Sequence, residues 1–276
     1  MVREATCSVH DSPVGAPRND IEAVRSATRR VLRTVDELTD AQAASASSLP
    51  EWTRAEVLAH LARNADGFRN MAEGAAQGES RKMYPGGSTQ RADGIAAGRN
   101  ERATVLVQDL RTTADALMES WGGLTDDAWS YSGETPSATR TLAVCPWLRL
   151  REVELHHVDL DLGYACTDWP VTFVTRALTE GMQTLQQRAA SGRPIVNARY
   201  RVEATDQGQG WTVSLDGSDV DVDPDGDSAE DVAATVSGWG CDLLAWLNGR
   251  RPAGGTLTAT GDEMRALRLP QWFPYS

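Results

Sequence analysis

One helical segment constrains this chain more than any other feature of its sequence. Apolar residues cover most of the segment from Trp147 to Leu162, and within it Glu152 and His156 stand four residues apart. This spacing places two side chains on one face of a helix, one turn apart, and Asp159 falls in the same sector. Because a buried unpaired charge is very costly, these polar groups need partners, and a metal ion is one such partner.

A second predicted helix offers a third ligand for the same ion. Thr53 and Glu56 form a capping-box pattern that begins this helix, and His60 lies at the edge of its apolar stripe. With Glu152 and His156 it gives two histidines and a carboxylate, a set that is typical of catalytic zinc and leaves one coordination position open. Spacing alone keeps an alternative open, since a histidine beside an apolar stripe is often a hydrogen-bonded core residue.

Composition and charge exclude several classes of partner. The 276 residues are 41% hydrophobic and 24% charged, which predicts one large or two modest globular domains. A net charge of −12 argues against nucleic-acid binding. The sequence has no apolar run of about 18 residues that could span a membrane. The polar N-terminus lacks the apolar core of a secretory signal, so we expect a cytoplasmic protein, as a monomer or weak homodimer.

The four cysteines predict reduced thiols rather than a metal or disulfide framework. Cys7, Cys145, Cys166 and Cys241 are widely spaced and form no C-x-x-C pair, so a cysteine-based zinc site is not expected. Cys145 stands before Pro146, at the predicted start of the helix that carries Glu152, and a helix N-terminus lowers the pKa of a thiol. Cys145 is therefore the one credible internal nucleophile.

The periodicity of the chain changes from helical to mixed along its length. Helical patterns cover residues 19–42, a stretch that begins at Thr53, residues 89–121 with a bend near Gly94 and Gly98, residues 146–162, and a stretch from Pro170 to about residue 190. Strand patterns follow at 198–205, 210–215, 233–236 and 256–260, with an acidic loop at 219–227 and a helix at 242–248. We predict an α+β chain with a flexible N-terminal extension (1–18), a helical bundle (19–165) and a small α+β domain (166–276) that carries all the strands.

Two long motifs resemble the signatures of a known family. The segment Trp52–Ala65 is similar to the first signature of mycothiol-dependent maleylpyruvate isomerase, and Trp147–Leu160 is similar to the second. Met83-Tyr84-Pro85 resembles the loop between them, with Arg91 and Ile95 behind it. Leu244–Arg250 and Pro270–Phe273 resemble parts of the C-terminal domain of that family.

The resemblance implies a fold, a metal and a cosubstrate. The fold is a DinB-like four-helix bundle followed by a sterol-carrier-like α+β domain. The metal is zinc, or another divalent ion, on the matching positions His60, Glu152 and His156. The cosubstrate is the small-molecule thiol mycothiol, which reacts with a small electrophilic substrate. A long N-terminal extension and an acidic segment at 216–231 depart from the family pattern, so the substrate pocket can differ.

Four further residues are candidates for binding or catalysis. The resemblance implies that Arg250 acts in the active site, although from the residues alone it reads as a solvated charge after a helix. Arg149 is a weaker choice for holding a substrate carboxylate. Tyr84 either lines the pocket or anchors a loop, and Asn64 either reaches the thiol cofactor or faces solvent.

Three functions compete on this evidence. The first is mycothiol-dependent isomerisation of maleylpyruvate, and the second is mycothiol S-transfer or thiol exchange on another electrophile, in detoxification or natural-product biosynthesis. The third is a non-catalytic metal-binding protein, against which the intact set of His60, Glu152 and His156 argues. Nothing in the sequence separates the first two.

Overall fold

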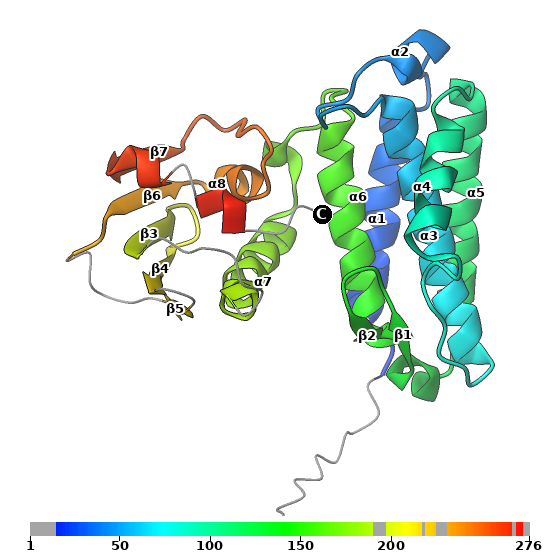
Figure 1. Cartoon of the computed structure of the whole chain (residues 1–276). Helices are drawn as coiled ribbons and strands as arrows, with labels where there is room; N and C mark the ends of the chain where they lie inside the picture. Colours follow the sequence, from blue (N-terminus) through cyan, green and yellow to red (C-terminus); the bar gives the residue numbers. More distant parts are fainter. Residues whose placement is uncertain (1–14, 190–196, 217–218, 225–230, 267–268, 273–276) are drawn as a thin grey trace, which may run out of the picture. The chain divides into compact units, whose positions relative to one another are not determined.

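The fold was analysed in a computed structural model that describes residues 15–189, 197–216, 219–224, 231–266 and 269–272. The chain divides into two compact units, Met1–Leu160 and Asp161–Ser276, and each is described by itself (Figure 1). We expected the boundary at residue 165. Most of the expected N-terminal extension, residues 1–14, lies outside the described residues.

Four long helices make up most of the N-terminal unit. They lie side by side in Figure 1 and span α1 (Arg18–Thr34), α3 (Arg54–Ala76), α5 (Ala103–Gly122) and α6 (Cys145–Asp159). Two shorter helices, α2 (Asp40–Ala44) and α4 (Gly87–Gly98), and the 3-10 turns η1 (Asp126–Ser130) and η2 (Leu142–Val144) connect them. The unit therefore has the helical bundle that the sequence predicted.

Helix α3 begins where its capping box predicts. The Thr53 hydroxyl accepts from the backbone N–H of Glu56 at 3.3 Å, and Oε2 of Glu56 accepts from the N–H of Thr53 at 2.9 Å. Most of the helix is buried, so it forms the centre of the unit. Helix α4 packs closely on it at Gly98, where an added Cβ would collide with the side chain of Ala59.

Two of our helix predictions were too long. The helix expected over 89–121 is broken after Gly98, and the chain resumes as α5 at Ala103. The helix expected over 19–42 ends at Thr34, and α2 then begins with its own capping box between Thr39 and Gln42. The bend expected near Gly98 is thus a break between two helices, whereas the link after Thr34 lies inside a pattern that stays helical in period, and periodicity alone does not detect it.

The prediction that the C-terminal domain (166–276) carries all the strands was wrong. Strands β1 (Ser132–Glu134) and β2 (Thr139–Thr141) pair antiparallel in the N-terminal unit, directly before α6. Each strand has three residues and β2 is fully exposed, so the pair carries no alternation of apolar residues from which it could be predicted.

The C-terminal unit is a five-stranded sheet with helices. Its elements are η3 (Cys166–Asp168), α7 (Val171–Ala189), β3 (Ala198–Ala204), β4 (Gln209–Asp216), β5 (Asp219–Pro224), β6 (Ala234–Gly238), α8 (Gly240–Leu247), β7 (Thr258–Gly261), α9 (Glu263–Ala266) and η4 (Leu269–Trp272). The strand order is β5-β4-β3-β6-β7. In this sheet the β3–β6 pair is parallel, and the chain passes through β4 and β5 between these two strands; the other three pairs are antiparallel.

The strand alternation was read correctly in β3 but missed in β5. In β3 the side chains of Tyr200, Val202 and Ala204 are buried and their neighbours are less so, as expected for half of a hairpin. Residues 219–224, expected in an acidic loop, pair with β4 instead. Val220 and Val222 alternate there with aspartates, and we gave the acidic character more weight than the period of two. Residues 225–227 of that loop lie outside the described residues.

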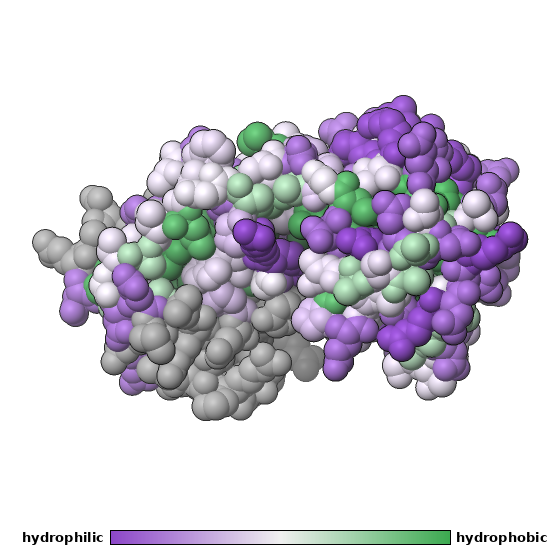
Figure 2. Space-filling model, turned by 90° about the horizontal axis from the view of Figure 1, so that it is seen from above, coloured by the Kyte–Doolittle hydropathy of each residue, from purple (hydrophilic) through white to green (hydrophobic). Residues whose placement is uncertain are grey.

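The surface of the described residues mixes polar and apolar side chains. On the face shown in Figure 2, hydrophilic residues are interspersed with small hydrophobic groups. Within the described part of the chain, none of the helices is both long and apolar enough to cross a membrane.

Candidate metal centre

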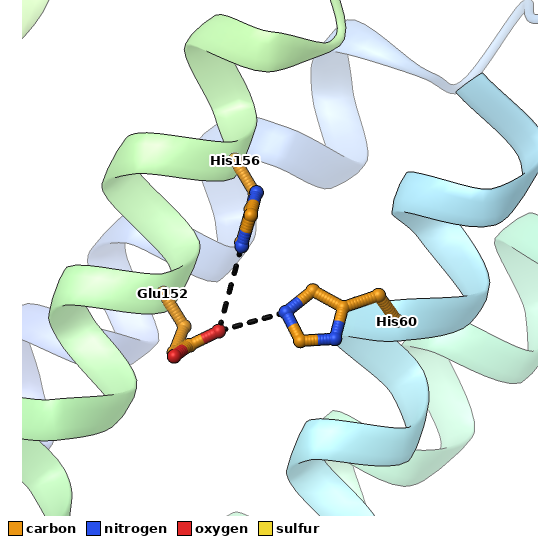
Figure 3. Close-up of side chains that lie close together, drawn as sticks. All are labelled: His60, Glu152 and His156. Carbon is orange, nitrogen blue, oxygen red and sulfur yellow. Dashed lines mark hydrogen bonds and ion pairs between the residues drawn. The ribbon is translucent and has the colours of Figure 1, made fainter. Parts of the chain in front are cut away.

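Three side chains meet between α3 and α6 (Figure 3). Nε2 of His60 lies 2.8 Å from Oε2 of Glu152, and Nε2 of His156 lies 3.5 Å from the same oxygen. The two imidazole rings stand edge to face, with centroids 4.6 Å apart. One donor atom from each residue thus falls within 4.8 Å of the other two, which is the separation that a shared metal ion requires.

The three side chains differ in their exposure to solvent. His60 and His156 are buried, whereas the side chain of Glu152 is 23% exposed. Because Glu152 and His156 are one turn apart on α6, both face α3, where His60 sits in the first half of that helix. Of the three side chains, that of Glu152 is therefore the most exposed to solvent.

Burial and the hydrogen bonds between these side chains set their protonation states. Burial lowers the pKa of His60 to about 4, against the hydrogen bond to Glu152, which raises it. Burial alone would raise the pKa of Glu152, but its hydrogen bonds to His156 and His60 hold that pKa well below the usual value. Glu152 is therefore an anion and His60 a neutral imidazole at neutral pH, the states in which both groups bind metals.

Asp159 orients His156 from behind. Its Oδ2 lies 2.8 Å from Nδ1 of His156, and Ser48 contacts its other oxygen at 3.4 Å. Burial lowers the pKa of His156, but the hydrogen bonds to the carboxylates of Asp159 and Glu152 outweigh burial and raise it. A carboxylate accepts here, so Nδ1 carries a proton and Nε2 faces Glu152. Asp159, which the helix spacing placed in the same sector, therefore contacts His156.

Arg91 and Trp52 also border the cluster. Nη2 of Arg91, on α4, lies 3.4 Å from Nδ1 of His60, and the Trp52 ring stands edge-on to the same imidazole at 5.8 Å. The sequence assigned no role to either residue, although both lie within or beside the family motifs.

His157 points away from the cluster. Its Nε2 lies 2.8 Å from the hydroxyl of Thr34 on α1, and burial, with the nearby charge of Arg30, lowers its pKa to about 3. One residue along α6 turns the side chain by about 100°, which separates it from His156.

The predicted binding residues Arg149, Asn64 and Tyr84 lie in the same unit. Arg149 is buried, and its Nη1 donates to the Leu61 carbonyl and to Oδ1 of Asn64, each at 2.8 Å. Its Nε and Nη2 atoms have no hydrogen-bond partner among the described residues. Tyr84 is buried, and burial raises its pKa to about 12. Asn64 therefore anchors Arg149 and does not face solvent.

Arg250 and Cys145 differ from their sequence interpretations. Arg250 follows α8 in the C-terminal unit, is buried, and donates through Nη1 to the Asn248 carbonyl at 2.8 Å, so it is not a solvated charge. Its catalytic role stays a prediction. Cys145 is fully buried, and burial raises its pKa to about 12. Desolvation outweighs the helix N-terminus at this thiol.

Comparison with known proteins identifies the family. The family model described as "Mycothiol maleylpyruvate isomerase N-terminal domain" matches residues 24–161, a range that includes His60, Glu152 and His156. The chain belongs to this family.

Two solved structures share the fold of this family member. One is a crystal structure of the mycothiol-dependent maleylpyruvate isomerase, at 22% sequence identity and a TM-score of 0.73. The other is a histidine-to-alanine mutant of that isomerase, at 21% identity and a TM-score of 0.72. Each alignment covers 88% of this chain and 92% of the other. No curated protein matches the chain.

The cluster fits a divalent metal in its donor atoms and its charge. Two imidazole nitrogens and one carboxylate oxygen converge, with Nε2 of both histidines directed to Oε2 of Glu152. A set of this kind holds zinc with one position left for a ligand. The N-terminal unit of this family member therefore has three residues that could hold the ion.

Proposed function

We propose that this chain is a mycothiol-dependent isomerase of maleylpyruvate, or of a close analogue, with zinc held by His60, Glu152 and His156. The observation that carries the proposal is the convergence of these three donor groups within 4.8 Å in a chain of this family. The similar solved structures, described as mycothiol-dependent maleylpyruvate isomerase, support the same choice. Another divalent metal at this site would serve the same proposal.

The chemistry needs a thiolate at neutral pH. A free thiol with a pKa near 8.5 is only a few per cent ionised there, and a zinc ion bound at these residues would supply the deprotonation. The thiolate adds to the conjugated cis double bond, the resulting single bond rotates, and the thiolate leaves again. The thiol is therefore regenerated and the substrate is isomerised without net oxidation or reduction.

The remaining residues bind and orient the reactants in this proposal. The Nε and Nη2 atoms of Arg149 face no partner among the described residues, so they can donate to an anionic group of the thiol or the substrate. Asn64 holds the guanidinium in place through Nη1. Tyr84 keeps its hydroxyl proton, because its pKa is about 12, and can donate it. We assign Arg250 to a substrate carboxylate, on the family resemblance.

The structure disfavours Cys145 as the nucleophile. Its Sγ donates to the Thr141 carbonyl at 3.7 Å and is buried, with a pKa of about 12. Such a thiol is almost wholly protonated at neutral pH and is shielded from a substrate. An external thiol is therefore the better nucleophile.

The test compares isomerisation of maleylpyruvate with and without mycothiol. The wild type and Cys145→Ala should both turn over with mycothiol, and both should lose activity without it. Glutathione should replace mycothiol poorly. Turnover by the wild type without any thiol, together with its loss in Cys145→Ala, would contradict the proposal. Recovery of a stable mycothiol–substrate conjugate, instead of free thiol and isomer, would identify a transferase.

A further inference from the structure

Two cysteines and an aspartate converge in the C-terminal unit, although the sequence predicted four unrelated thiols. Cys166 lies on η3, and Cys241 and Asp242 lie in the first turn of α8. Their two Sγ atoms and a carboxylate oxygen all fall within 4.8 Å of one another. The Sγ of Cys166 is 3.6 Å from Oδ1 of Asp242, close to the separation of two ligands on one tetrahedral ion.

Backbone and hydroxyl donors fix the carboxylate of Asp242 in this cluster. Its Oδ2 accepts from the N–H of Thr256 at 2.9 Å and from the Thr256 hydroxyl at 2.8 Å. Its Oδ1 accepts from the N–H of Gly254 at 2.7 Å and keeps a second lone pair on the side of Cys166. The N–H of Ala253 donates to the Sγ of Cys166 at 3.3 Å. Supporting donors of this kind orient the ligands of metal sites.

Acidic groups lie close to the two thiols. Burial, together with the nearby Cys166, Asp242 and Asp206, raises the pKa of Cys241 to about 12, against a backbone hydrogen bond at Asp242. Burial also raises the pKa of Cys166. A cation that binds the thiolates would relieve the repulsion among these groups.

We propose that Cys166, Cys241 and Asp242 form a second metal site, which takes a thiophilic divalent cation of the zinc class. Two sulfurs and one carboxylate oxygen select zinc or cadmium over magnesium and calcium, which prefer oxygen ligands alone. Binding converts both thiols to thiolates and releases their two protons to solvent. Cys241 is only partly buried, which gives an ion a route to the site.

The bound ion would link two segments of the C-terminal unit and so stabilise it. It would join η3 to the start of α8, and Asp242 already ties that helix to residues 253–256 through its hydrogen bonds. Ligands that bind the folded state alone stabilise it by mass action. The proposal does not depend on the function of the histidine centre, whose donors are nitrogen and oxygen only.

The test titrates the reduced full-length chain with cadmium and follows the ultraviolet thiolate-to-cadmium charge-transfer band. The histidine centre has no sulfur donor, so it is silent in this band. Cys7→Ser combined with Cys145→Ala serves as the background. We expect the band to appear and to saturate in the background protein, and to disappear in both Cys166→Ser and Cys241→Ser made in that background. No band in the background protein, or a band that survives either added substitution, would overturn the proposal.

A second measurement needs no variant and so does not depend on how the variants fold. Alkylation of Cys241 in the reduced wild type is followed by peptide mass spectrometry, with and without cadmium. The ion should protect Cys241 several-fold, whereas an equal rate of alkylation in both samples would count against the site. A Cys166–Cys241 disulfide that persists in the presence of reductant, with no response to cadmium, would also overturn it.

Discussion

The two imidazoles of the candidate metal centre differ in the group that faces Nδ1. His156 donates from Nδ1 to Asp159, and its Nε2 lies 3.5 Å from Oε2 of Glu152. His60 faces a donor, Arg91, at Nδ1 and the carboxylate of Glu152 at Nε2. A metal bound at Nε2 leaves the ring proton on Nδ1, where His156 has an acceptor in Asp159, whereas in His60 that proton would face the guanidinium of Arg91.

Asp159→Asn should weaken zinc binding. The substitution removes the negative charge behind His156 and makes the imidazole a poorer ligand, which typically lowers metal affinity about 10–100-fold. Competition with a chromophoric chelator measures the dissociation constant. Asp36→Asn, at an exposed aspartate of the same unit, is the control and should bind as the wild type does. Equal affinities for Asp159→Asn and the wild type would show that Asp159 does not support the ligand.

Arg91→Gln should strengthen zinc binding. The guanidinium only donates hydrogen bonds and is positively charged, so it opposes both a proton on Nδ1 of His60 and a nearby cation. Glutamine can accept from Nδ1 instead, and we expect affinity to rise about tenfold, at the lower end of the effects of such supporting residues. The matched variant Arg91→Lys keeps the charge and the donor, and should stay close to the wild type. Weaker or unchanged binding in Arg91→Gln would contradict this reading.

At the scale of elements, α1 is held to α6 by a buried ion pair. Arg30 on α1 pairs with Glu154, which is fully buried on α6, and Thr34 contacts His157 one turn further along. This second face of α6 is polar for a structural reason, whereas the face of Glu152 and His156 meets α3. One helix therefore carries two polar faces that serve different partners.

Arg30→Ala should destabilise the N-terminal unit. Its loss leaves the carboxylate of Glu154 buried without this cation, and breaking a buried pair typically costs about 3 kcal/mol. Urea denaturation followed by circular dichroism measures the free energy of unfolding. Arg29→Ala removes the neighbouring arginine, whose contacts to Glu22 and Ser26 are exposed, and should change that free energy by less than about 0.5 kcal/mol. A similar small change in both variants would mean that the buried pair contributes little.

The sequence predicted elements well where their pattern is regular and long. The capping box at Thr53 and the four-residue spacing of Glu152 and His156 placed two helices and the face that carries the cluster, because both rules act within one or two turns. The contacts of Arg91 and of Cys166 depend on how separate segments return to each other. Such contacts leave no periodic signal in the chain, so the second cluster was not predicted.

At the scale of the whole molecule, the chain combines a helical unit and a mixed unit, each with its own cluster of ligand groups. The family match covers residues 24–161 and so bears on the first unit and its histidine centre. The cluster of Cys166, Cys241 and Asp242 belongs to the second unit. Any assay of bound metal must therefore separate the two clusters.

The most direct test of the central claim is the zinc content of purified protein, measured by elemental analysis in the Cys241→Ser background. This background removes a ligand of the second cluster and leaves the histidine centre intact. We predict close to one zinc per chain, retained in His157→Ala and lost in both His60→Ala and His156→Ala, because His157 contacts Thr34 and the other two face Glu152. Zinc that persists in His60→Ala and His156→Ala, or that is lost only in His157→Ala, would contradict the account.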